Sequence, residues 1–281
     1  MATCHVTQRR NRPEAAARLG PLNDQLLPVQ STGQFEDRKK MLIPVVQVNP
    51  TFTGDWKADK HIVKEIAESP MTAQTAYEHA QVVMTLFNRL TYGTPSAPDY
   101  PMRSGLVRKV YDELFPIAYF AKLYFSESSE VVICWHDGNQ QFDATVKDER
   151  PGPGESRINY LEVTTLQNGE DAHLLSRMAK ENTICIEGDQ DQFNYLRKVD
   201  LLKVALKKKA AIKYPPQTAL LVYTDEDRIQ RFSFGKDFRK VDRKGSFAAA
   251  LEEMQDFLTG FSAVFVYSKH EIYCSLTMHI E

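Results

Sequence analysis

The stretch "INYLEVTTLQ" (residues 158–167) is largely apolar and carries one carboxylate, Glu162, at its centre. Its β-branched and aromatic residues predict a buried strand. A charged group inside such a strand is costly unless another group pairs with it. We therefore expect Glu162 to have a partner elsewhere in the chain.

A second carboxylate, Asp143, occurs in the predicted strand "QFDATVKD" (141–148). Side chains two residues apart in a strand share a face, so Glu162 lies with Thr164 and Asp143 lies with Gln141. If the two strands are neighbours, the two carboxylates lie side by side and repel each other. A hard divalent cation with oxygen ligands, Mg²⁺ or Mn²⁺, would relieve that repulsion. The alternative is that each carboxylate lies at a strand end, where it is hydrated or paired with an arginine.

The pattern around these strands predicts an α/β fold with a mixed sheet flanked by helices. The predicted helices span 103–125, 170–182, 191–214 and 246–261, and the predicted strands span 130–136, 141–148, 158–166, 218–225, 262–268 and 271–278. A kink is expected at Pro116, because proline cannot donate a helical hydrogen bond.

Three segments are predicted along the chain. Residues 1–50 are rich in Arg, Gln and Pro and are interpreted as a partly irregular N-terminal arm. Residues 51–101 form a helical extension, in which the second of two helices starts with Ser69 as N-cap and Pro70 at its first position. Residues 102–281 carry the α/β core.

The composition excludes several classes of protein. A net charge of −2 over 281 residues gives no global attraction to nucleic acid or to a membrane, so any such attraction must be local. The sequence contains no apolar run long enough for a membrane helix and no secretory signal, so no membrane association is expected. The four cysteines form no CxxC pair, which argues against a zinc site and favours a cytoplasmic location.

Three motifs together resemble the PD-(D/E)xK nuclease-like superfamily. They are "GNQQFDATV" (138–146), "YLEVTTL" (160–166) and "KVALKKKAAIKYPPQTALLVY" (203–223), and the resemblance covers roughly residues 105–225. It implies a restriction-endonuclease-like αβββαβ core. It also implies hydrolysis of phosphodiester bonds in nucleic acid, assisted by Mg²⁺ or Mn²⁺.

The resemblance also assigns roles to individual residues. Asp143 matches the first acidic metal ligand and Glu162 the second, while Glu113 is the acid that the first core helix would contribute. Thr164 stands where the superfamily typically has a lysine that positions or activates the attacking water. A hydroxyl group cannot supply that positive charge.

A lysine from a neighbouring helix can replace the missing one in variants of the superfamily. The predicted helix that contains residues 203–213 offers several, and Lys209 shares a stripe of that helix with Lys213. Either of these two lysines is a candidate for the catalytic cation.

Two basic segments, 197–213 and 228–244, make nucleic acid the leading partner, with DNA ahead of RNA. The second segment interleaves aromatic residues that could stack on unpaired bases. The basic candidates for nucleic-acid binding are Lys203, Lys207, Lys208, Arg231, Lys236, Arg239 and Lys240. Gln141 is a further candidate for contact with a phosphate or a metal-bound water. The alternative for each segment is a solvated helix face.

Three functions are therefore compared. The first is a metal-dependent nuclease that acts in defence or on a mobile element. The second is a catalytically degraded nuclease fold that binds nucleic acid or protein. The third is a component of a larger assembly in which residues 1–100 dock a protein partner or a second copy of the chain.

Overall fold

The computed structural model describes residues 5–6, 52–53, 55–91, 105–150, 158–166, 184–185, 191–224 and 242–278. The chain divides into a large unit, residues 1–8 and 52–281, and a small unit, residues 9–51, which lies outside the described residues. Almost all of the predicted arm therefore lies outside the described residues, as does the predicted helix 170–182.

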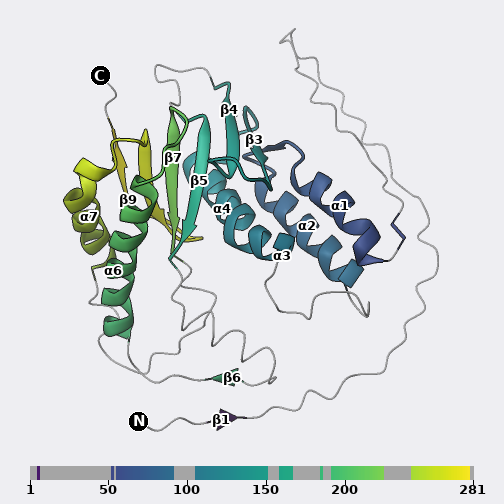
Figure 1. The fold of residues 1–281 in the computed structure, drawn as a ribbon, viewed down its shortest axis with the longest axis horizontal. Helices are drawn as coiled ribbons and strands as arrows, with labels where there is room; N and C mark the ends of the chain where they lie inside the picture. Colours follow the sequence, from purple (N-terminus) through teal and green to yellow (C-terminus); the bar gives the residue numbers. More distant parts are fainter. Residues whose placement is uncertain are drawn as a thin grey trace, which may run out of the picture. The chain divides into compact units, whose positions relative to one another are not determined.

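The large unit is built on a seven-stranded mixed sheet with the strand order β2-β3-β4-β5-β7-β8-β9 (Figure 1). The strands are β2 (Met71–Thr72), β3 (Val131–Trp135), β4 (Ala144–Asp148), β5 (Tyr160–Thr165), β7 (Thr218–Tyr223), β8 (Ala263–Tyr267) and β9 (Ile272–Thr277). β5, β7 and β8 run parallel, and the remaining neighbours are antiparallel. The α/β prediction with a mixed sheet is confirmed. β1 (His5–Val6) and β6 (Ile184–Cys185) form a separate antiparallel pair.

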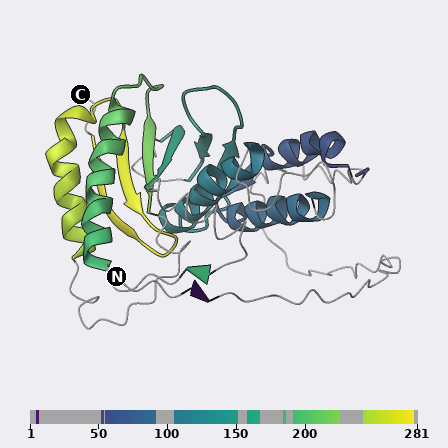
Figure 2. The same ribbon diagram turned by 60° about the horizontal axis from the view of Figure 1, so that its bottom comes forward.

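Helices cover both faces of the sheet. They are α1 (Trp56–Ala67), α2 (Ala76–Thr91), α3 (Gly105–Lys109), the π-helical segment η1 (Val110–Leu114), α4 (Phe115–Tyr124), α6 (Asp191–Ala210), α7 (Arg243–Met254) and the short 3₁₀ helix η3 (Gln255–Phe257). Figure 2 shows α6 and α7 together on one face and α4 on the other, with α1 and α2 packed beyond α4.

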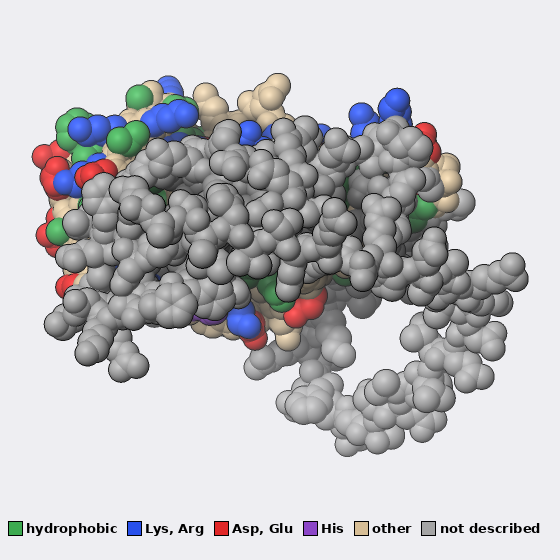
Figure 3. Space-filling model, turned by 90° about the horizontal axis from the view of Figure 1, so that it is seen from below, with side chains coloured by type: hydrophobic (Ala, Val, Ile, Leu, Met, Phe, Trp, Pro, Cys, Tyr) green, Lys and Arg blue, Asp and Glu red, His purple; other side chains and the backbone are tan. Residues whose placement is uncertain are grey.

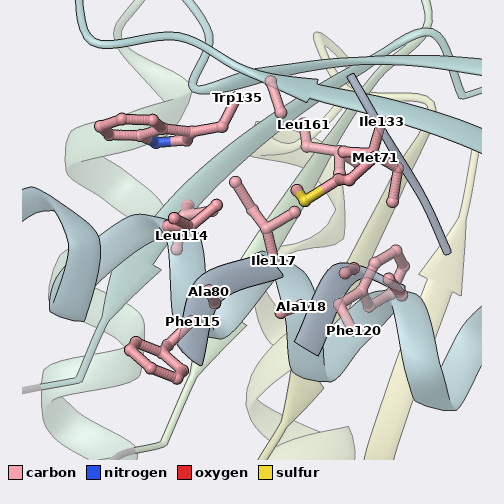
Figure 4. Packing of buried hydrophobic residues seen from close by; sticks show 14 of the residues in the cluster. Met71, Ala80, Leu114, Phe115, Ile117, Ala118, Phe120, Ile133, Trp135 and Leu161 are labelled. Carbon is pink, nitrogen blue, oxygen red and sulfur yellow. The ribbon is translucent and has the colours of Figure 1, made fainter. Parts of the chain in front are cut away.

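Alternation along the strands divides the buried side chains between the two faces. Leu161 and Val163 of β5 belong to the cluster beneath α4, and Leu220 and Val222 of β7 belong to the cluster beneath α6 and α7. Figure 4 shows the first cluster, in which Trp135 and its neighbours from the sheet meet apolar side chains of η1 and α4. Glu162 alternates with Leu161 and Val163 and so faces α6.

Several predicted boundaries are wrong. The helix expected from Ser69 begins at Ala76, because Met71–Thr72 pairs with β3 as an edge strand and Met71 is buried in the core. The helix expected over 191–214 ends at Ala210. The helix expected over 246–261 runs from Arg243 to Met254, and its N-cap is Asp242, whose carboxylate accepts from the Gly245 amide.

The helix expected over 103–125 is present from Gly105 to Tyr124, with a π-helical segment directly before the position of the predicted kink. The Phe115 amide donates to the Val110 carbonyl, five residues earlier. This wider turn lies directly before Pro116, which cannot donate to the carbonyl of Asp112 four residues earlier.

Candidate active site

Asp143 and Glu162 lie close together at the end of the pairing between β4 and β5, near enough for the charge of Glu162 to raise the pKa of Asp143. β4 and β5 pair in a register that joins Ala144 to Leu161, so Asp143 directly precedes the first paired residue of β4 and Glu162 directly follows its partner on β5. The Asp143 amide donates to the Leu161 carbonyl at 2.8 Å, one residue out of the register of the pairing, so the regular ladder ends at Ala144. The structure therefore brings together the two carboxylates that the strand pattern predicts to be neighbours.

The two strands separate directly beyond this pair. The Val163 amide donates at 2.7 Å to Oδ2 of Asp143. On its other side, the Asp143 carbonyl accepts from the His136 amide at 2.9 Å. Asp143 is thus fixed through both its backbone and its side chain, with its carboxylate at the point where β4 ends and β5 continues.

Glu162 is 8% exposed and is paired with a cation from the facing helix. Nζ of Lys209, in the last turn of α6, forms an ion pair with Oε1 of Glu162. The Tyr214 hydroxyl lies 3.4 Å from the same oxygen and donates to it. Burial, and then the negative charge of Glu162, raise the pKa of Tyr214, so its hydroxyl stays protonated and remains a donor. Lys209 and Tyr214 are therefore partners of the buried Glu162 carboxylate.

Glu113 approaches the carboxylate pair from η1, on the other side of the sheet. The Trp135 indole Nε1 donates to Oε2 of Glu113 at 3.2 Å. Burial, and then the charge of Asp143, raise the pKa of Glu113 to about 8. Burial, and then the charge of Glu162, raise the pKa of Asp143 to about 7, against the opposing effects of the Val163 amide and Lys209. Three carboxyl groups therefore share one electrostatic environment.

A network around Asp137 extends the site and was not predicted from the sequence. Asp137 lies in the turn between β3 and β4, and its carboxylate pairs with Lys109 at 2.6 Å and with Lys64 at 3.3 Å. The hydrogen bond from Lys109 to Asp137 raises the lysine pKa, and the charges of Glu113 and Asp143 raise it further. The sequence signal was weak, because these residues come from α1, α3 and a turn that lie far apart along the chain.

Three more predicted site residues, Thr164, Lys213 and Gln141, belong to β5 or to the segments next to α6 and β4. Thr164 is half-buried on the same face of β5 as Glu162. Lys213 lies beyond the end of α6 and is exposed, so between the two candidate lysines the structure brings Lys209 to the site. Gln141 is exposed and precedes β4, which begins at Ala144 and not at residue 141.

The predicted basic surface is described only in part. Lys207 and Lys208 are exposed in the last turn of α6, whereas Lys203 forms an ion pair with Glu253 of α7. Arg231, Lys236, Arg239 and Lys240 lie outside the described residues. On the face in Figure 3, the described Lys and Arg side chains lie in separate groups at its margins, with acidic side chains nearby.

Asp143 and Glu162 are the two carboxylates that a hard divalent cation would require as protein ligands in the sequence-based hypothesis. Among the residues that the structure describes, no group of three His, Cys, Asp or Glu side chains converges as a metal site. Mg²⁺ usually needs only one or two protein carboxylates, with waters and phosphate oxygens completing its shell. Asp143 and Glu162 supply two carboxylates, of which Asp143 Oδ2 accepts from the Val163 amide and Glu162 Oε1 pairs with Lys209.

Comparisons with protein-family models, with curated proteins and with solved structures found no match for this chain. In the described part of the chain, no helix is both long and apolar enough to cross a membrane.

Proposed function

We propose that this chain is a metal-dependent nuclease that hydrolyses phosphodiester bonds in nucleic acid. The observation that carries the proposal is the proximity of Asp143 and Glu162 at the point where β4 and β5 separate, with Lys209 paired to Glu162. Carboxylates held close together and partly desolvated favour a cation between them. The resemblance of the strand and helix motifs to PD-(D/E)xK nucleases supports the same chemistry.

Each side chain has a role consistent with its contacts. Asp143 and Glu162 would hold Mg²⁺ or Mn²⁺, which when bound polarises the scissile phosphate and acidifies a water molecule. In phosphoryl transfer, negative charge spreads over the phosphoryl oxygens and the leaving oxygen. Lys209 carries a positive charge on the same face of the sheet and would stabilise that charge. It would supply from α6 the charge that Thr164 lacks.

Glu113 would act beside the ion-binding pair. Its raised pKa keeps a proton available near neutral pH, and Trp135 fixes one of its oxygens. A carboxyl group in this state can donate a hydrogen bond to a substrate oxygen or a water, and can exchange a proton with it. Lys207 and Lys208, exposed in the last turn of α6, would contact the phosphate backbone next to the site.

The direct test is a cleavage panel of single- and double-stranded DNA and RNA with Mg²⁺, Mn²⁺ or EDTA. The matched variant is Asp143→Asn with Glu162→Gln, which removes both charges with little change of shape. We expect metal-dependent cleavage of at least one substrate by the natural chain and none by the double variant. Cleavage that persists in the double variant would show that the proposed site is wrong.

A second function, nucleic-acid binding without cleavage, is favoured by Thr164 at the position where a lysine is typical. It predicts that the chain binds a nucleic acid in the same panel while cutting none. The participation of this chain in defence or in a mobile element belongs to the same proposal, as does preference for DNA over RNA. A third candidate, docking of a partner through residues 1–100, would be indicated by a protein that co-purifies only when these residues are present.

A further inference from the structure

Pro116 removes one backbone hydrogen-bond donor from the helix that carries Glu113. In an uninterrupted α-helix the amide of residue 116 would donate to the Asp112 carbonyl, but proline has no amide hydrogen. The Thr165 hydroxyl, from the end of β5, donates to that carbonyl at 3.1 Å. A side chain of the sheet therefore makes the hydrogen bond that the helix itself cannot make.

A second hydroxyl of the sheet acts on the other side of the same proline. The buried Tyr267 hydroxyl, on β8, donates to the Pro116 carbonyl at 2.8 Å. The sheet thus holds the helix by carbonyls at residues 112 and 116, on either side of Glu113. The π-helical turn, Val110–Leu114, overlaps the first part of this interval.

The register of that turn decides where Glu113 points. A π-helical turn contains about one residue more than an α-helical turn, so its loss would rotate the following or preceding side chains by roughly 100°. Glu113 now reaches the Trp135 indole and the neighbourhood of Asp143. Without the wider turn, these contacts could not be kept together with the packing of Leu114, which is fully buried.

We propose that Thr165 is a positioning residue for Glu113: its hydrogen bond to the Asp112 carbonyl fixes the π-helical turn that presents Glu113 to the carboxylate pair. The inference rests on the proposed function for its catalytic consequence. Its structural consequence, the contact between Glu113 and Trp135, is independent of catalysis. Thr165 itself lies on the α4 face of β5, opposite to the face of Glu162.

The test uses Thr165→Val, which keeps the shape of the side chain and removes its hydroxyl, and Thr165→Ser, which keeps the hydroxyl. The first readout is the indole N–H resonance of Trp135 in a ¹⁵N–¹H spectrum. The chain has two tryptophans, and Trp56→Phe assigns the two signals. We expect Thr165→Val to shift the Trp135 signal and to accelerate exchange of its indole proton, and Thr165→Ser to retain both.

Cleavage kinetics give the second readout. Misplacing a catalytic group by about 1 Å can cost up to 10²-fold, so we expect Thr165→Val to lower kcat roughly tenfold or more with little change of KM. The control is Thr224→Val. Thr224 is also buried and its hydroxyl also donates to a backbone carbonyl, that of Tyr267 at 3.3 Å. We expect this control to lose stability while leaving the Trp135 signal and kcat unchanged.

A compensating substitution distinguishes positioning from general damage. Pro116→Ala supplies an amide that can donate to the Asp112 carbonyl in the α-helical pattern, so Thr165→Val in that background should shift the indole signal little relative to Pro116→Ala alone. This double variant also provides a folded protein if Thr165→Val alone unfolds. An unshifted indole signal in Thr165→Val, or an equal shift with and without Pro116→Ala, would overturn the inference. If the natural chain cleaves nothing, the proposed function fails, whereas the indole result still decides the role of Thr165.

Discussion

The Val163 amide donates to the Asp143 carboxylate at 2.7 Å, across the point where β4 and β5 separate. In a continuous ladder this amide would bond a backbone carbonyl of the neighbouring strand. Because the pairing ends at Ala144–Leu161, the Val163 amide donates instead to the Asp143 side chain. This bond holds the Asp143 carboxylate against the residue that follows Glu162. A local ending of strand pairing thus both creates the carboxylate pair and fixes one of its members.

Asp143→Asn should stabilise the protein in the absence of metal and abolish metal binding. The pKa of Asp143 is raised from 3.8 to about 7, so the ionised carboxylate destabilises the folded state at pH 8, a cost that the uncharged amide of Asn avoids. We expect the free energy of unfolding at pH 8 to rise by about 1 kcal/mol, measured by urea denaturation in EDTA. Unchanged metal affinity by calorimetry would contradict the assignment of Asp143 as a ligand.

Glu113 should make the stability of the protein decrease as the pH rises. Its folded pKa, about 8, lies above the ordinary value of 4.5, so the folded state binds more protons than the unfolded state between these values. This contribution to stability is fully present below pH 4.5 and is lost as the pH rises through 8. Denaturation curves from pH 5 to 9 should therefore show Glu113→Gln gaining stability relative to the natural chain. A constant difference across this range would exclude the raised pKa.

Lys209 and Lys213 should differ sharply on substitution by methionine. Lys209 is ion-paired with Glu162, whereas Lys213 is exposed beyond the end of α6. We expect Lys209→Met to lower kcat roughly 10²-fold, the range found when a charge-stabilising group is lost. Lys213→Met should retain kcat within a factor of about two, because the Lys213 side chain is exposed. A twofold change in rate corresponds to less free energy than one hydrogen bond to a charged group contributes. Equal losses in single-turnover assays would contradict the choice of Lys209.

Substitution of Lys207 and Lys208 by glutamine should weaken nucleic-acid binding in a salt-dependent way. If each contacts one phosphate, the slope of log affinity against log salt becomes shallower by about 0.9 per lysine on duplex DNA. Lys203→Gln is the matched control, because Lys203 is engaged by Glu253 on α7. Fluorescence anisotropy over a salt series measures these slopes. A larger effect of Lys203 than of the exposed pair would place the binding surface elsewhere.

The proximity of Asp143 to Glu162 could be predicted because the side-chain period of a strand is fixed and the two strands follow each other along the chain. The α/β class followed from the same kind of local pattern. The choice of Lys209 could not be predicted, because it depends on α6 ending at Ala210, and propensity defines helix ends poorly.

The network of Lys64, Lys109 and Asp137 could not be predicted from local sequence patterns, for a different reason. Its members come from three segments whose meeting depends on packing across the whole unit. The same holds for the environment of Pro116. A kink was the expectation from proline alone, but the sheet supplies Thr165 as a substitute donor, and the helix adopts a π-helical turn.

The short pairing of β4 with β5 also has a mechanical consequence. These strands are joined at Ala144–Leu161 and Thr145–Tyr160, whereas β5 and β7 pair continuously from Tyr160 to Thr165. The short β4–β5 pairing is therefore the junction between β2-β3-β4 and β5-β7-β8-β9, and Asp143 and Glu162 lie at the end of that pairing. An ion bound by both carboxylates would join these two parts of the sheet. Binding of the ion would therefore also stabilise the junction between them.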